Sequence, residues 1–113
     1  MKIYKILTAQ QWTQAQNTGV FRGAPVDLHD GFIHFSTAQQ VEETARKHFK
    51  GQEDLLLAVI DDASLGEALR YEPSRGGQLF PHLFASLSLG MIERIDPLPM
   101  TPDGFHRFEG LLP

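Results

Sequence analysis

The sequence predicts a compact α+β fold in which a split sheet, mixed or antiparallel, is flanked by two or three helices. Residues 55–60 form a continuous apolar run (LLLAVI) that is short enough for a strand buried on both faces. Two other segments, 8–19 and 36–51, carry helix start signals and apolar residues at helical spacing. A chain of 113 residues has the usual size of one domain, so we assign residues 1–113 to a single domain.

The first half of the chain is expected to alternate between strands and helices. Residues 3–7 predict a first strand, and Thr8 with Gln11 forms a capping-box signature for a helix that ends near Gly19. A loop at 22–30 then leads to a strand at 31–35. A second helix should follow, capped by Ser36 or Thr37. Its apolar stripe should contain the residues at i, i+4, i+7 and i+8, which are Val41, Ala45, His48 and Phe49.

The second half is expected to complete the sheet. The strand at 55–60 should lie in its middle, followed by a turn or short helix at 61–68, a strand at 69–72 and a loop at 73–77. Apolar residues at positions 80, 83, 84 and 87 predict one or two helical turns, with Pro81 suited to a first helical position. Strands at 90–95 and 105–109 should close the domain.

Composition excludes several classes of function. A net charge of -4 has the wrong sign for general nucleic-acid binding. The absence of cysteine removes disulfide scaffolds, thiol nucleophiles and zinc-thiolate sites. No apolar run approaches the ~20 residues of a membrane span, and the first residues do not resemble a secretory signal. We therefore expect a cytoplasmic protein that does not contact membranes.

The segment 31–37 (GFIHFST) is the strongest indication of a ligand site. It places an imidazole and two hydroxyls where a buried strand gives way to a helix. Side chains alternate across a strand, so Ile33 and Phe35 should share one face while Phe32, His34 and Ser36 share the other. One face can then belong to the core and the other to a small-molecule cleft.

His34 could act as a general acid or base, or as a donor to a sugar hydroxyl. The alternative is a half-buried histidine that only satisfies its own hydrogen bonds. Ser36 and Thr37 fit plain helix capping, although a helix N-terminus also offers free N–H groups to a phosphate.

Two further positions carry candidate chemistry. The strand 69–72 should direct Glu72 away from the face that carries Tyr71, so its carboxylate could hold a ribose hydroxyl or stabilise developing positive charge. An ion pair with Arg70 or Arg75 is the alternative. His82 lies off the predicted apolar stripe and is free to line a cleft or to face solvent. No two candidate ligands have a helix-facing metal spacing such as H-x-x-x-H, so we expect no metal.

Taken in order, four segments resemble the domain of unknown function 952 family of bacteria and plants. They are residues 3–6, 30–37, 71–72 and 80–84, and the resemblance spans nearly the whole chain. It implies a fold similar to that of the ADP-ribosyltransferases, whose split sheet holds NAD in a central cleft. Active members of that group commonly carry a histidine or arginine on the first strand, where this chain has Tyr4 and Lys5.

Two hypotheses therefore stay open. The first is an NAD-dependent transferase or glycohydrolase, with NAD as the substrate, no metal, and a small-molecule or nucleotide ligand as the partner. Its catalytic residues would be His34, Glu72 and His82, and its ligand-binding residues Phe32, Ser36, Thr37, Tyr71 and Arg75. The second is a non-catalytic domain that binds a small molecule or a protein. The enzyme hypothesis requires that the side chains of His34, Glu72 and His82 converge on one cleft.

Overall fold

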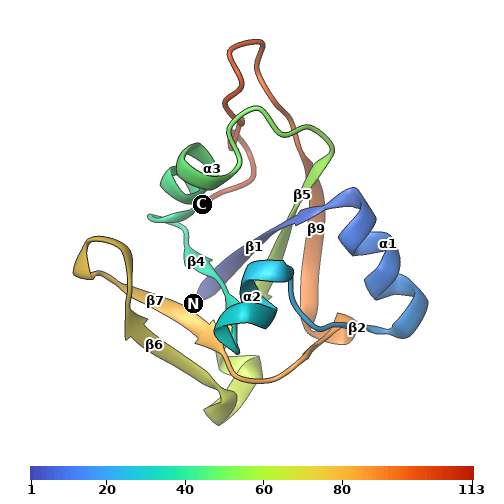
Figure 1. The fold of residues 1–113 in the computed structure, drawn as a ribbon, viewed down its shortest axis with the longest axis vertical. Coiled ribbons are helices and arrows are strands. Elements are labelled where there is room, and N and C mark those ends of the chain that lie inside the picture. The colour runs from blue at the N-terminus through green and yellow to red at the C-terminus, as the bar shows by residue number, and fades with distance from the viewer.

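A four-stranded sheet forms the centre of the molecule in the computed structural model, which describes residues 1–113 (Figure 1). Its strands are β1 (Lys2–Thr8), β4 (Ser36–Thr37), β5 (Leu55–Asp61) and β9 (Ile92–Leu98), in the order β4-β1-β5-β9. All neighbouring strands are antiparallel. The apolar run at 55–60 lies inside this sheet, as its sequence predicts, because β5 pairs on both sides.

Two smaller antiparallel sheets complete the fold. The first has the order β3-β7-β6, with β3 (Ile33–His34), β6 (Leu69–Pro73) and β7 (Leu79–Leu83). The second pairs β2 (Val20–Phe21) with β8 (Leu87–Ser88). The chain crosses from the three-stranded to the four-stranded sheet at Phe35, whose backbone N–H donates to the carbonyl of Pro81 at 2.9 Å. At this crossing a single residue therefore separates the two larger sheets.

Three α-helices lie around these sheets: α1 (Ala9–Thr18), α2 (Pro25–Asp30) and α3 (Val41–His48). The predicted capping box is confirmed at α1, because the Thr8 hydroxyl accepts from the backbone of Gln11 and the Gln11 side chain accepts from the backbone of Thr8. Gly19 ends this helix in the left-handed conformation. Short 3₁₀ segments cover Asp62–Ala68, Arg75–Gly77 and Leu89–Met91. No helix has the length and apolar character needed to cross a membrane.

Alternation along β1 and β5 divides the core into two apolar clusters, one on each face of the four-stranded sheet. Ile3 and Leu7 pack with Ala58, Ile60 and the core face of the three-stranded sheet. Tyr4 and Ile6 pack on the opposite face, under α3 and the C-terminal segment. The buried members of this second cluster are Tyr4, Ile6, Val41, Ala45, Leu55, Leu57, Val59, Leu98 and Phe108.

The predicted loop at 22–30 is wrong, because its second part folds as α2. Pro25 occupies the first turn of this helix, the Asp27 carboxylate accepts from the backbone N–H of Ala24, and Gly31 ends the helix with φ 85°. These three residues are a helix signature that the small and polar composition of the segment concealed.

The predicted helical turns at 80–87 are also wrong. This segment forms β7 and then β8, and β7 pairs with strands on both sides. Phe80 and His82 lie on one face of the sheet and Pro81 and Leu83 on the other, so a period of two governs the segment. The predicted strand at 105–109 is reduced to an isolated bridge between Met100 and His106.

The helix predicted after residue 36 is α3, which begins only at Val41, so neither Ser36 nor Thr37 caps it. Gln40 stands at the N-cap position without a side-chain capping bond, and its side chain accepts from the backbone N–H of Thr37 to close a turn. Val41 and Ala45 are buried as predicted. His48 was expected in the apolar stripe but is exposed, which makes it available to the cleft described next.

Candidate functional site

A cleft of about 580 Å³ opens between the three-stranded sheet, β1 and α3. Its size falls in the range of small-molecule sites. The loop before α2 and the connection between β6 and β7 contribute to its walls. Polar and ionisable side chains make up much of the lining, namely Lys5, Asp30, His34, Ser36, Thr44, His48, Arg75 and His82.

The three predicted catalytic side chains lie together on one face of the three-stranded sheet. His34 on β3 and His82 on β7 are register partners, and their ring centroids are 5.5 Å apart. Glu72 on β6 is within hydrogen-bond distance of the His82 ring. The other face of the same strands packs Ile33 and Leu83 into the core. His34 and His82 therefore both line the cleft, whereas Glu72 contacts His82 without lining the cleft itself.

Asp27 is the centre of a buried ionic network beside the cleft. Its carboxylate lies 2.7 Å from His34 Nδ1 and 2.9 Å from Lys5 Nζ, and it accepts from the backbone N–H groups of His34 and Ala24. Burial opposes the ionisation of Asp27, but the His34 hydrogen bond and the Lys5 charge outweigh it and lower the pKa to about 2.

Lys5 is the cation that stands on the first strand in place of the expected histidine or arginine. Its side chain is almost fully buried, and burial lowers the pKa of its ammonium group while the charge of Asp27 acts in the opposite direction. We take the pair as ionised, because four donors converge on the Asp27 carboxylate. Lys5 is thus already engaged with a partner inside the protein.

His34 is held between two carboxylates. Its Nδ1 faces Asp27, and its Nε2 lies 2.9 Å from a carboxylate oxygen of Asp30. An imidazole ring can donate to both oxygens only when both nitrogens carry hydrogen. Asp30 is partly exposed at the cleft, so a ligand can reach the outer nitrogen of His34 by displacing that carboxylate.

His82 has one engaged nitrogen and one free nitrogen. Its Nδ1 lies 2.9 Å from Glu72 Oε1, while its buried Nε2 has no hydrogen-bond partner. The ring is 4% exposed and stacks on Phe32 with the centroids 4.1 Å apart. When Nδ1 donates to the Glu72 carboxylate, Nε2 is left as an acceptor. A hydroxyl or amide of a ligand would satisfy it.

Arg75 lies at the other end of the cleft, beside α3. Its Nη2 donates to the hydroxyl of Thr44 at 3.1 Å, and its guanidinium lies 4.9 Å from the ring centroid of Phe80. The hydroxyls of Thr44 and Ser36 are 2.9 Å apart. The pKa of His48 is lowered by partial burial first and then by the charges of Arg75, Lys47 and His34.

Three predicted ligand-binding residues do not line the cleft. Tyr71 lies on the opposite face of β6, where its hydroxyl donates to Asp62 at 2.7 Å. Burial raises the pKa of the phenol, and the hydrogen bond to Asp62 raises it further. Thr37 does not line the cleft, and Phe32 contacts the site through the rings of His34 and His82, with centroid distances of 4.5 and 4.1 Å. Ser36 and Arg75 do line the cleft, as predicted from the sequence.

Five polar side chains of the site were missed in the sequence. Lys5 was noted only as a substitute, although a lysine inside the apolar strand 3–7 needs a buried partner. Its partner Asp27 follows Pro25 at the third helical position, which is a recognisable signal. Asp30, Thr44 and His48 carry no such signal. No group of three or more histidine, aspartate or glutamate side chains is placed to hold a metal ion.

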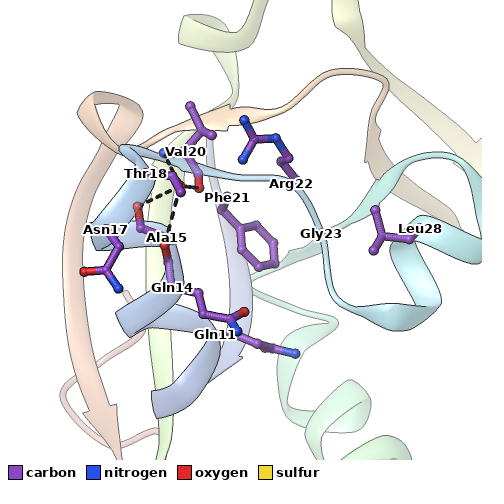
Figure 2. A pocket seen from close by; sticks show the side chains of 10 residues that line it. All are labelled: Gln11, Gln14, Ala15, Asn17, Thr18, Val20, Phe21, Arg22, Gly23 and Leu28. Carbon is purple, nitrogen blue, oxygen red and sulfur yellow. Dashed lines mark hydrogen bonds between the residues drawn. The ribbon is translucent and has the colours of Figure 1, made fainter.

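A second hollow of about 450 Å³ lies against α1 and has a different character (Figure 2). Gln11, Gln14 and Asn17 line it with amide groups, and Arg22 supplies its single charged side chain. Figure 2 shows Thr18 bonded to nearby backbone oxygens at its edge. No histidine or carboxylate lines this hollow, so it offers less chemistry than the cleft.

Comparison with known proteins gives a family match and close structural relatives. The family model described as "Protein of unknown function (DUF952)" matches residues 6–95. The crystal structure of protein CC0527 from Caulobacter crescentus is similar at 42% identity, with a TM-score of 0.95 and coverage of 98% of this chain and 97% of that chain. Its solution structure is similar at 43% identity and a TM-score of 0.88, covering 98% and 96%. No curated protein matches.

Proposed function

The chain belongs to the DUF952 family, and we propose that its cleft binds a nucleotide of the NAD type and transfers or hydrolyses the ADP-ribosyl group. One observation carries the proposal. The ring of His82 is almost fully buried beside the cleft, Glu72 holds one of its nitrogens, and the other nitrogen has no partner. The resemblance to ADP-ribosyltransferases, noted from the sequence, supplies the candidate substrate.

The Glu72–His82 pair supports the assignment of an acid–base group. Buried polar atoms are nearly always hydrogen-bonded, so the free nitrogen of His82 calls for a partner from outside the protein, which is a water or a ligand. A carboxylate that accepts from Nδ1 fixes the tautomer in which Nε2 can take a proton. General-base catalysis of this kind contributes roughly 10²–10⁴-fold to a rate.

The proposed step breaks the bond between the nicotinamide nitrogen and the anomeric carbon of the ribose. The bonding electron pair leaves with nicotinamide, and a new bond forms between the anomeric carbon and the oxygen of water or of an acceptor hydroxyl. The proton of that oxygen passes to Nε2 of His82. Glu72 acts through His82 by stabilising the imidazolium that forms.

His34 and Ser36 are proposed to bind the nicotinamide ribose. They are two residues apart on the segment that joins the two sheets, and both line the cleft. The outer nitrogen of His34 can donate to a ribose hydroxyl once Asp30 is displaced. Lys5 supports this arrangement indirectly, because it fixes the carboxylate that holds the inner nitrogen of His34.

A non-catalytic binding domain is the second candidate. It is favoured by the engagement of the cations nearest the predicted ribose site. Lys5 is paired with Asp27, and both nitrogens of His34 face carboxylates. A site built in this way could hold a ligand without activating a bond.

Calorimetric titration with NAD, ADP-ribose and nicotinamide, together with an assay for nicotinamide release, tests the proposal. We expect saturable binding of NAD and ADP-ribose, which His34→Ala weakens. His82→Gln should reduce nicotinamide release by at least ~100-fold and change NAD affinity by less than ~10-fold, because only the base is removed. His106→Gln is the matched control, since His106 also has a buried unpartnered nitrogen but does not line the cleft.

The outcomes separate the two candidates. Binding of ADP-ribose without release of nicotinamide supports the non-catalytic domain. Absence of binding at millimolar concentrations of all three compounds contradicts the proposal. Equal effects of the His82 and His106 substitutions contradict the role of the Glu72–His82 pair.

A further inference from the structure

The end of the cleft beside α3 contains an arginine, Arg75, most of whose hydrogen-bond donors have no partner within the protein. Arg75 forms one hydrogen bond, from Nη2 to the Thr44 hydroxyl, and it forms no ion pair with any carboxylate. A guanidinium has five N–H donors, so four remain for a ligand. Arginine forks match the oxygens of phosphoryl and carboxylate groups, which makes an unpaired arginine in a cleft an anion-binding candidate.

The guanidinium is held in place before a ligand arrives. It lies over the ring of Phe80, with 4.9 Å to the centroid, and the Thr44 hydroxyl fixes one of its nitrogens. Thr44 is itself fixed, since its hydroxyl also contacts the backbone oxygen of Gln40 and the hydroxyl of Ser36. A pre-positioned donor loses less conformational entropy when it binds.

The charges around this end indicate the sign of the ligand. His48 lines the same part of the cleft, and both burial and the nearby positive charges of Arg75, Lys47 and His34 lower its pKa. The carboxylates of Asp27 and Asp30 are instead engaged by Lys5 and His34. An anion would therefore be attracted to the Arg75 end, where the guanidinium has no carboxylate partner.

We propose that Arg75, positioned by Thr44 and Phe80 and assisted by His48, binds a phosphoryl group of the ligand. The inference deepens the proposed function, because it orients a phosphorylated ligand in the cleft with its phosphoryl group beside α3 and its hydroxyls toward His82. It does not depend on NAD, since any small phosphorylated compound that fits the cleft would use the same donors.

The test uses inorganic pyrophosphate as the probe and nicotinamide riboside as a control ligand that has no phosphoryl group. Pyrophosphate binding is followed by calorimetry and by the NMR signals of the His48 ring. We expect saturable binding that raises the pKa of His48, because a bound anion stabilises the imidazolium. Arg75→Met should weaken pyrophosphate binding at least ~10-fold, or ~1.4 kcal/mol, which is near the low end of the ~1.5–3 kcal/mol for a hydrogen bond to a charged group.

Arg70→Met is the matched control. Arg70 also places its guanidinium over a phenylalanine ring, 5.1 Å from the centroid of Phe84, but it does not line the cleft. Its removal should change pyrophosphate affinity less than 2-fold. Thr44→Val should give an intermediate loss, because it frees Arg75 without removing the charge. Thermal unfolding of each variant confirms that the fold is retained, and Arg75→Lys serves in place of Arg75→Met if that variant unfolds.

The results distinguish this inference from the proposed function. Pyrophosphate binding that depends on Arg75 supports the phosphoryl site even when NAD does not bind. Binding of NAD that is unchanged in Arg75→Met overturns the phosphoryl site and leaves the proposed function standing, whereas nicotinamide riboside, which has no phosphoryl group, should bind equally well to Arg75→Met and to the wild type. Absence of pyrophosphate binding at tens of millimolar, or equal losses in the Arg75 and Arg70 variants, also overturns it.

Discussion

The cleft and the hollow against α1 have similar volumes, about 580 and 450 Å³, yet their walls differ in almost every chemical respect. Three ionisable side chains in the wall of the cleft are held by carboxylates behind it, since Asp27 binds Lys5 and His34 and Glu72 binds His82. The hollow is lined by three amide side chains, two of them exposed, by a single arginine, and otherwise by apolar residues with Thr18 and Gly23.

The difference shows that the volume of a cavity is a weaker guide to function than the free energy needed to bury the charged groups around it. Burying Lys5 and Asp27 removes two charges from water, which costs several kcal/mol per ion before their attraction offsets it. Apolar residues could occupy such positions at lower cost. A chain that retains a buried ion pair beside a cleft is thus holding particular groups in place, and nothing comparable is held around the hollow.

The largest expected effect follows from removing the charge of Asp27. Asp27→Asn leaves Lys5 buried without a carboxylate, so the free energy of unfolding should fall by about 3–5 kcal/mol. Asn17→Ala, in the exposed wall of the α1 hollow, should stay within about 0.5 kcal/mol. Urea unfolding measures both. A loss below about 1 kcal/mol for Asp27→Asn would remove the proposed distinction between the two cavities.

Gly23 offers a second test of the comparison, because it lines the α1 hollow and lies next to Asp27, the centre of the ionic network beside the cleft. It lines the α1 hollow with φ 126°, and a β-carbon there would lie 2.8 Å from the β-carbon of Asp27. Gly23→Ala should therefore destabilise the protein by about 1–3 kcal/mol and disturb the His34 ring signals in NMR spectra. Gly90→Ala is the control, since its nearest neighbour would be the Ser88 hydroxyl at 3.8 Å. Unchanged His34 signals would show that Asp27 is not held by this contact.

A smaller effect should appear in the dependence of stability on pH. The folded protein lowers the pKa of Asp27 from 3.8 to about 2, so the stabilising contribution is complete above about pH 4 and is lost as the pH falls through 2. The loss should be about 2 kcal/mol, from the size of the shift. The gap in unfolding free energy between wild type and Asp27→Asn should narrow over this range. A constant gap between pH 4 and 2 would contradict the assignment.

Much of the fold could be predicted where a local signal agrees with the tertiary structure. The capping box of Thr8 and Gln11 is local and is confirmed, and the apolar run in β5 admits burial on both faces. The segment at 80–87 fits periods of two and of 3.6, and pairing with β3 and β6 decides between them. Such long-range pairing is not encoded in the spacing of one segment.

The residues of the site could likewise be predicted where a local signal places them, and were missed where their role depends on a distant partner. Alternation in residues 31–36 and 69–72 placed His34 and Glu72 on the face that they occupy, because strand geometry fixes the face of each side chain. Asp27 was missed because its role depends on Lys5, which is 22 residues earlier in the chain. Thr44 and His48 were missed because the spacing of residues along one helix shows its apolar face but not which of its polar side chains lie opposite another element.

The passage of the chain through Phe35 constrains how this protein can change over evolution. His34 and Ser36 face the cleft from two different sheets, and the single residue between them is buried in the core. Substitutions at 34 and 36 can alter ligand chemistry one side chain at a time. Insertion or deletion of one residue would exchange the inward and outward positions and bring an apolar ring into the cleft. The length of this segment is therefore less free to vary than its composition.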